Sequence, residues 1–155
     1  MIEPNTLREK IAEIRPYIPE IKSVKFVVDD DEFAAELKDH AVNDNILLVV
    51  VVPSFNGFGK EDESGIRSFL QFFLMEKIDF KHFKTQDQYI DVFQKVLIVL
   101  RKFLKHIFHA SESDESVNCL SMNLDYSSLK INPVTKKSQC NGWVIEIDEE
   151  KYEDF

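Results

Sequence analysis

The chain is poor in the residues that cross-link or interrupt a fold, because its 155 residues include two cysteines, four glycines and one tryptophan. Two cysteines are too few for a disulfide framework. We expect Cys119 and Cys140 to be free thiols in a reducing compartment, although neighbouring strands would allow a bridge. The longest apolar run, residues 46–52, is far shorter than the ~20 residues that span a bilayer. Residues 1–4 do not open a signal peptide, so we expect a cytoplasmic protein.

Basic residues are also scarce, with 19 against 28 acidic residues and a formal net charge of −9. Proteins that bind nucleic acids displace counterions with a basic stripe. The only dense basic stretch, Arg101, Lys102 and Lys105, is expected at a helix end, where cations complement the helix dipole. The composition therefore argues against direct binding of DNA or RNA. It favours solubility and a partner with a basic face.

Motifs for catalysis and metal binding are missing as well. His106 and His109 would need two more zinc ligands, and Cys119 and Cys140 are the only soft candidates, at a spacing that matches no zinc motif. We interpret the two histidines as residues near a helix end. The sequence has no nucleophile motif and no phosphate-binding loop. We predict no catalytic, metal-binding or cofactor-binding residues and no small-molecule substrate.

Two short segments have alternative interpretations that involve ligands. Residues 57–60 superficially resemble a phosphate-binding turn, but three acidic residues follow and would repel phosphate. Residues 29–32, all acidic, offer oxygen ligands for a divalent cation, but their spacing is not that of a calcium loop. We interpret the first as part of a hairpin loop and the second as a helix cap.

The sequence does contain apolar residues with the periods of helices and strands. Capping boxes predict two helices, one from Thr6 to about Arg15 and a long amphipathic one from Thr85 to about Phe108. A short helix is expected at residues 29–38, and strands are expected at about residues 23–28, 46–52, 67–77, 118–126 and 142–147.

These elements predict the fold class α+β, as one domain over residues 1–155. About five strands, antiparallel or mixed, would form a sheet packed against the long helix. Turn residues occur at 132–138, and the acidic tail at 148–155 is expected to fray. Thirteen phenylalanines indicate a dense aromatic core or, alternatively, a surface for self-association.

A loop is expected at residues 54–65, between two strands that we expect to pair as antiparallel neighbours. The loop contains glycines, Phe55, Phe58 and Lys60, and loops of this length tend to be functional. Aromatic residues in a polar loop often anchor a partner. We predict Phe55, Phe58 and Lys60 as a possible interface, with the alternative that the two rings fold back onto the core.

A resemblance adds to these expectations. After the long helix and a polar strand, the chain reaches Asn141, Gly142 and Trp143 in its last predicted strand. In this it resembles small phage and prophage proteins from gut Bacteroides-type bacteria, whose chains end in a similar Gly-Trp strand. The order of elements is also similar to that of tail terminator and tail-completion proteins, which form rings at the head–tail junction.

The resemblance implies a ring-forming structural component of a phage tail or neck. The protein would bind other copies of itself and other virion proteins. It would do so first in the bacterial host cell and then in the virion. The resemblance transfers no functional residues, because the sequence offers no catalytic motif to match. Two alternatives stay open: an acidic inhibitor or immunity-type protein that masks a basic partner, and an enzyme whose site is assembled from scattered residues.

Overall fold

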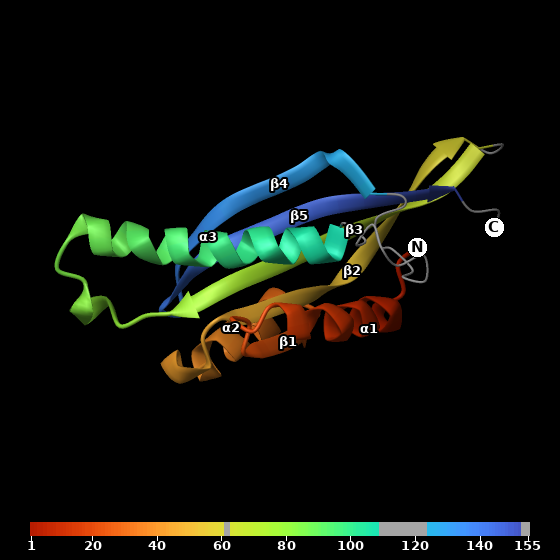
Figure 1. The fold of residues 1–155 in the computed structure, drawn as a ribbon. Helices are drawn as coiled ribbons and strands as arrows, with labels where there is room; N and C mark the ends of the chain where they lie inside the picture. Colours follow the sequence, from red (N-terminus) through yellow and green to blue (C-terminus); the bar gives the residue numbers. More distant parts are fainter. Residues whose placement is uncertain (61–62, 109–123, 153–155) are drawn as a thin grey trace.

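The structure is a computed structural model that describes residues 1–60, 63–108 and 124–152 (Figure 1). It contains three α-helices, α1 (Pro4–Ile14), α2 (Asp30–Asp39) and α3 (Gln86–Phe108). The strands are β1 (Ser23–Val27), β2 (Leu47–Lys60), β3 (Glu63–Lys77), β4 (Leu124–Lys137) and β5 (Cys140–Tyr152). Short 3₁₀ helices occur at Arg15–Tyr17, Val42–Asp44 and Phe80–His82.

The five strands form one mixed sheet in the order β1-β2-β3-β5-β4. β1 is parallel to β2, and the other neighbours are antiparallel. The predicted α+β class, with about five strands and one long helix packed on the sheet, is confirmed. The expected antiparallel pairing of the second and third strands is confirmed too, and β3 lies at the centre of the sheet.

One face of the sheet is covered by α1 and α3, which lie across it in Figure 1. The side chains of β3 that point to this face include Leu70, Phe72 and Leu74, and all three are buried. From α3, Phe103 meets Phe72 edge to face, with ring centroids 5.2 Å apart. The apolar stripe that the sequence shows along α3 therefore forms the main core.

The other face of the sheet is covered only in part. α2 places Phe33 and Leu37 against Phe73 and Met75 of β3. The Lys77 ammonium group donates a hydrogen bond of 2.8 Å to the Lys38 carbonyl at the end of α2. The cap predicted for α2 is confirmed, since the Asp29 side chain accepts a hydrogen bond from the Glu32 amide at 2.9 Å. A second, smaller core fills this part of the fold.

The predicted helix starts have different outcomes. At α3 the Thr85 hydroxyl accepts a hydrogen bond from the Gln88 amide at 3.3 Å, as a capping box requires. The capping box at Thr6 is wrong, because α1 begins at Pro4 and has no side-chain cap. Proline suits the first turn of a helix, where its missing N–H costs nothing.

The predicted loop at 54–65 and most of the predicted frayed tail are strands. Both belong to the candidate interaction site. Residues 54–60 and 63–65 continue β2 and β3, so the expected long loop is a hairpin with strand pairing to Lys60 and Glu63. The tail predicted to fray at 148–155 is paired over its described part, because β5 pairs with β3 as far as Tyr152, and residues 153–155 lie outside the described residues. The extra length of β5 stabilises the hairpin by giving it a third strand.

The C-terminal hairpin also differs from the prediction. The turn expected at 132–138 lies at Ser138 and Gln139, and residues 132–137 belong to β4. Both turn residues have positive φ, at 48° and 63°. Residues 118–123 of the strand predicted at 118–126 lie outside the described residues, as do Cys119 and His109. None of the described helices is long and apolar enough to cross a membrane.

Candidate interaction site: a projecting three-stranded arm

The sheet extends past the helices as a narrow arm. We define the arm as residues 54–60 of β2, residues 63–67 of β3 and residues 150–152 of β5. Figure 1 shows the arm projecting beyond the ends of α1, α3 and β4. It starts at an irregularity in β2, where the register with β3 shifts between Val51 and Ser54. Such bulges bend and twist a strand, and Pro53 lies within this one.

Phe58 packs against its own arm. Its ring lies over Gly65, its partner across β3, where an added Cβ would come within 2.6 Å of the ring. Tyr152 meets Phe58 edge to face at 5.1 Å between ring centroids, and the Arg67 guanidinium lies 5.8 Å from the Phe58 ring centre. An aromatic ring over a cross-strand glycine is a known device for holding an exposed sheet together.

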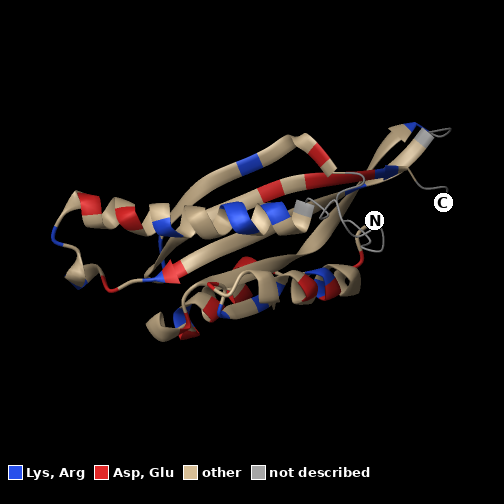
Figure 2. Cartoon of the chain, viewed as in Figure 1, with Lys and Arg blue, Asp and Glu red and all other residues tan. Residues whose placement is uncertain are grey.

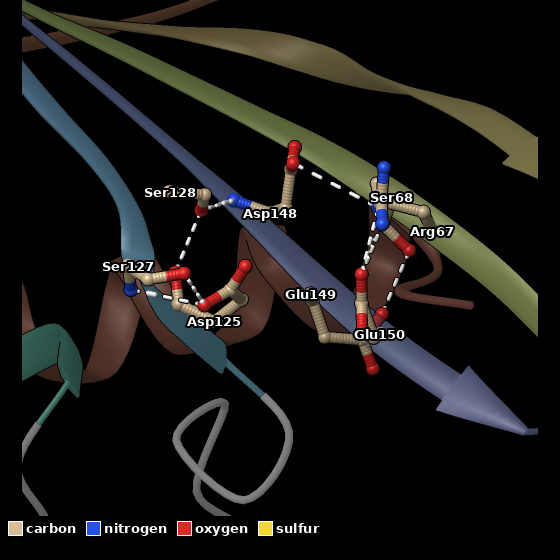
Figure 3. Close-up of polar contacts among 8 residues, drawn as sticks. All are labelled: Arg67, Ser68, Asp125, Ser127, Ser128, Asp148, Glu149 and Glu150. Carbon is tan, nitrogen blue, oxygen red and sulfur yellow. Dashed lines mark hydrogen bonds and ion pairs between the residues drawn. The ribbon is translucent and has the colours of Figure 1, made fainter.

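Arg67 links the arm to the acidic end of β5 (Figure 3). Its Nε donates a hydrogen bond of 2.9 Å to the Glu150 carboxylate and lies 3.8 Å from that of Asp148. The hydrogen bond to Glu150 raises the pKa of the Arg67 guanidinium, so this group stays charged. The ion pairs hold β3 and β5 together where no helix covers them.

The base of the arm is anchored to the N-terminus of the chain. Ser68 is buried, accepts a hydrogen bond of 3.2 Å from the Ile2 amide, and donates one of 2.8 Å to the Glu149 carboxylate. The Met1 amino group lies 3.9 Å from the same carboxylate. This buried network fixes the direction in which the arm leaves the sheet.

Beside the arm, β4 loses its regular pairing with β5 between Asp125 and Lys130. The Ser128 hydroxyl replaces a ladder bond by accepting a hydrogen bond of 2.8 Å from the Asp148 amide (Figure 3). The Asp125 carboxylate accepts hydrogen bonds from the side chain and amide of Ser127, which lower its pKa. Side-chain hydrogen bonds therefore replace the missing main-chain pairing between β4 and β5 in this segment.

The outer edge of the arm is open. β1 pairs with β2 only from Leu47 to Val51, and no described strand lies alongside residues 54–60. Phe55 is 37% exposed and points to the face of the sheet that carries α1 and α3. An unpaired edge presents amides and carbonyls to a further strand. The arm thus presents an edge without a described neighbouring strand, with Phe55 exposed beside it.

The predicted interface residues Phe55, Phe58 and Lys60 all lie on the arm, in one strand. The two aromatic residues differ. Phe58 folds back, but onto the arm and not onto the main core, whereas Phe55 is exposed. Lys60 is exposed opposite Glu63. Whether the three residues contact a partner stays a prediction.

The sequence did not single out Arg67, Glu150 and Tyr152, which complete the arm. The sequence carries no signal of alternation there, because residues 148–151, beyond the predicted strand end at Ile147, are all charged. They are extended because β5 pairs with β3 as far as Tyr152. Acidic side chains on β5 are compatible with a strand here because β3 supplies Ser68, Arg67 and Gln71 as hydrogen-bond donors.

One hollow on the surface adjoins the arm and another lies away from it. One, of about 540 Å³, is lined beside the arm by Leu124, Asp125, Glu150, Lys151 and Tyr152. The other, of about 530 Å³, is an apolar groove between α3 and the β4–β5 hairpin, lined mainly by Tyr89, Ile90, Phe93, Leu97, Pro133 and Trp143. The described residues contain no group of three or more metal-ligating side chains. His106 stacks on Tyr17 at 5.3 Å.

Charge is unevenly distributed, and Figure 2 shows a run of acidic residues along the second half of β5. These carboxylates have partners within the chain. Glu146 accepts a hydrogen bond of 2.8 Å from Gln71, Glu149 is buried beside Ser68, and Asp148 and Glu150 share Arg67. The run is therefore less available to an outside cation than its sequence suggests.

Neither a protein-family model nor a curated protein matches the chain.

Proposed function

We propose that the chain is a structural, protein-binding component of a phage or prophage tail or neck. In this proposal it assembles as a ring at the head–tail junction by using the arm as its contact. The partners are other copies of the chain and other virion proteins. Assembly starts in the cytoplasm of the bacterial host and ends in the virion.

The observation that carries the proposal is the arm, with its open edge and exposed Phe55. A ring needs a head-to-tail interface, in which one surface of a subunit meets a different surface of the next. An arm that projects past the rest of the subunit can reach a neighbour. Addition of a strand to its edge would supply main-chain hydrogen bonds, and Phe55 would supply an apolar anchor.

The resemblance that suggests a phage protein depends on Gly142 and Trp143, and both have roles in packing. A Cβ at Gly142 would come within 1.9 Å of the Leu74 carbonyl oxygen. The Trp143 indole donates a hydrogen bond of 3.0 Å to the Phe93 carbonyl on α3 and meets the Phe93 ring edge to face. The pair thus has a role in packing within this chain, and the proposed assembly role depends on the arm.

Purified tail tubes from the phage that encodes the chain provide the test. We expect the added chain to form a ring at one end of each tube in negative-stain electron micrographs. Phe55→Lys should abolish the ring, because it places a charge on the open edge. Ile90→Lys, which changes an exposed apolar residue on α3 instead, is the matched control and should bind normally. Tubes left bare by the unchanged chain would contradict the proposal.

A second candidate function is an acidic inhibitor or immunity-type protein. It is favoured by the net charge of −9 and by the exposed acidic residues Asp30 and Asp31 at the start of α2. A complex that depends on these charges would form through electrostatic attraction to a basic partner and would weaken steeply as salt rises. The test is to capture a partner on immobilised chain at low salt and then to raise the salt concentration. Release of the partner at physiological salt, or at up to about ten times that concentration, would support this function. A salt-resistant complex would count against it.

A further inference from the structure

The side of the sheet that carries the arm has a step in it. From Leu47 to Val51 the outermost strand is β1, and beyond the bulge the outermost strand is β2 itself, along residues 54–60. The step is one strand deep, or about 4.8 Å. It therefore has a raised part, formed by β1, and a recessed part, formed by the edge of the arm.

A stepped edge of this kind is complementary to itself. When a second copy is rotated by half a turn about an axis perpendicular to the sheet, its β1 faces the open edge of the first copy's arm. β1 runs parallel to β2 within one copy, so it runs antiparallel to the arm of the other. We propose that two copies pair in this way, each placing β1 along the arm of the other and extending the sheet through both.

The faces of the side chains agree with this pairing. Phe26 lies opposite Val50, and Phe55 lies opposite Ser68, so both rings belong to the face that carries α1 and α3. In a sheet, residues directly opposite each other share a face. The pairing can therefore set Phe26 of one copy opposite Phe55 of the other without turning either strand over.

Phe26 and Phe55 are also the two most exposed phenylalanines among the described residues, at 38% and 37%. Phe26 opposite Phe55 would form two equivalent aromatic pairs, one on each side of the two-fold axis. Cross-strand aromatic pairs are among the more favourable contacts in sheets. In the same register, Asn56 lies opposite Lys25 and Ser54 opposite Val27, so no like charges meet across the strands.

The recessed edge begins directly after the bulge and Pro53, and beyond them it lacks the features that usually prevent strands from pairing. Residues 54–59 contain no proline and no charge. On the opposite side of the sheet, β4 carries Pro133, Lys130 and Lys136 and has two breaks in its register. Prolines, lysines and bulges are common protections of edge strands. The arm is therefore the side of the sheet where pairing is expected.

One feature opposes the pairing and sets its salt dependence. β1 is followed by Asp29, Asp30, Asp31 and Glu32 at the start of α2. The half-turn brings the two β1 strands end to end, so these acidic segments approach each other near the two-fold axis. Salt screens their repulsion. Self-association should therefore become stronger as salt rises, whereas the capture of a basic partner should become weaker.

The inference rests on the proposed role of the arm as an assembly surface and names one partner for it, a second copy of the chain. Pairing around a two-fold axis is closed at two copies. It occupies the edge that a ring would use, so a tail tube or a neighbouring subunit has to displace β1 of the paired copy. The pair then protects the edge before assembly.

Disulfide cross-linking of the full chain provides the test, in a background with Cys119→Ser and with the buried Cys140 retained. Phe55→Cys and Phe26→Cys chains are mixed and oxidised. We expect a cross-linked pair that contains one chain of each kind. Phe26 lies beside Val50, and the β3 partners of Val50 and Phe55 are four residues apart, so the two phenylalanines lie about 14 Å apart within one copy, too far for an internal disulfide.

Two controls use the same chemistry. Lys25→Cys mixed with Phe55→Cys should give at least fivefold less product, because Lys25 points to the other face of the sheet. Phe55→Cys alone should give equally little, since the two copies of Phe55 lie about 14 Å apart in the proposed pair. Efficient cross-linking in either control, or none between Phe26→Cys and Phe55→Cys, would overturn the inference.

The pairing and the proposed function are separated by two lysine variants. Phe26→Lys and Phe55→Lys should each weaken self-association at least tenfold in light scattering. Only Phe55→Lys should also lose the ring on tail tubes, because Phe26→Lys leaves the arm intact. Rings without the Phe26–Phe55 cross-link would overturn the pairing and keep the function. If the cross-link forms but the tubes stay bare, the proposed function is overturned and the pairing is kept.

Discussion

The arm and the body of the sheet belong to the same strands but are stabilised by different interactions. In the body, β3 is buried between α1 and α3 on one face and α2 on the other, with Phe72 and Met75 fully enclosed. In the arm the same strand has no helix on either side. It is stabilised by Phe58 over Gly65 and by Arg67 with Glu150. The body therefore determines stability, and the outer edge of the arm has no described strand beside it.

The largest expected difference in the free energy of unfolding is between the variants of two phenylalanines. Phe103→Ala removes a fully buried ring from the body and should lower the free energy of unfolding by about 3–5 kcal/mol. Phe55→Ala removes an exposed ring from the arm and should cost less than about 0.5 kcal/mol. Urea unfolding of the two variants measures both values. Similar losses would mean that the arm is part of the cooperative core.

A second comparison uses two glycines on neighbouring strands. Gly142→Ala forces a methyl group against the Leu74 backbone in the body and should cost about 3 kcal/mol or more. Gly65→Ala meets the Phe58 ring, which can turn away, and the Lys151 carbonyl at 2.8 Å, which moves only if the end of β5 shifts, so it should cost about 1–2 kcal/mol.

Hydrogen exchange locates the two effects. Gly65→Ala should increase the exchange of arm amides alone, while Gly142→Ala should increase exchange throughout the sheet. Global destabilisation by Gly65→Ala would remove the boundary that we draw between the arm and the body.

The sequence predicts the body well and the arm poorly, for a physical reason. The period of α3 and the apolar run of β2 arise from burial, which repeats with the geometry of the element. In the arm, burial is incomplete, and glycines and charges replace apolar residues. Residues 54–65 therefore looked like a loop. The pairing with β5, far away in the sequence, keeps them extended.

The turn between β4 and β5 illustrates a second limit. Asn132, Pro133 and Lys136 are typical turn residues, but the chain turns at Ser138 and Gln139, in a backbone conformation that usually favours glycine or asparagine. Here the fit of β5 against β3, with Gly142 next to Leu74, determines the register. Local preference is overridden by contacts between distant strands.

The role of Phe55, Phe58 and Lys60 in an interface stays a prediction. Phe55, Phe58 and Lys60 are aromatic and basic residues near glycines, and they lie together in β2 on the arm. The sequence could not show which ring is exposed, because that depends on Tyr152 and Gly65 across the strands. It also could not show the step at Val51, since strand ends depend on tertiary pairing.

A third prediction uses Cys140, a buried thiol of the body. Burial raises its pKa from 9.0 to about 11. Because an unfolded thiol ionises first, folding stability should be unaffected below pH 9 and should fall as pH rises from 9 towards 11. The loss at pH 10 should be about 1 kcal/mol. Cys140→Ala removes this contribution, so the difference between the two chains should shrink by that amount; a constant difference would contradict it.

The smallest effect concerns the acidic start of α2, which separates the two parts of the stepped edge. Asp31 is exposed, whereas Asp29 caps the helix and Asp30 lies 3.3 Å from Lys137. Asp31→Asn therefore removes one charge per copy without removing a structural contact. We expect self-association to strengthen about two- to threefold at low salt, since surface charge pairs contribute only a few tenths of a kcal/mol, and to be unchanged at high salt.

Sedimentation equilibrium at both salt concentrations measures this, with Asp87→Asn on α3 as a control of equal charge that should have no effect. Equal strengthening by both variants would attribute the salt dependence to net charge, and the two acidic segments would then lie apart in the pair.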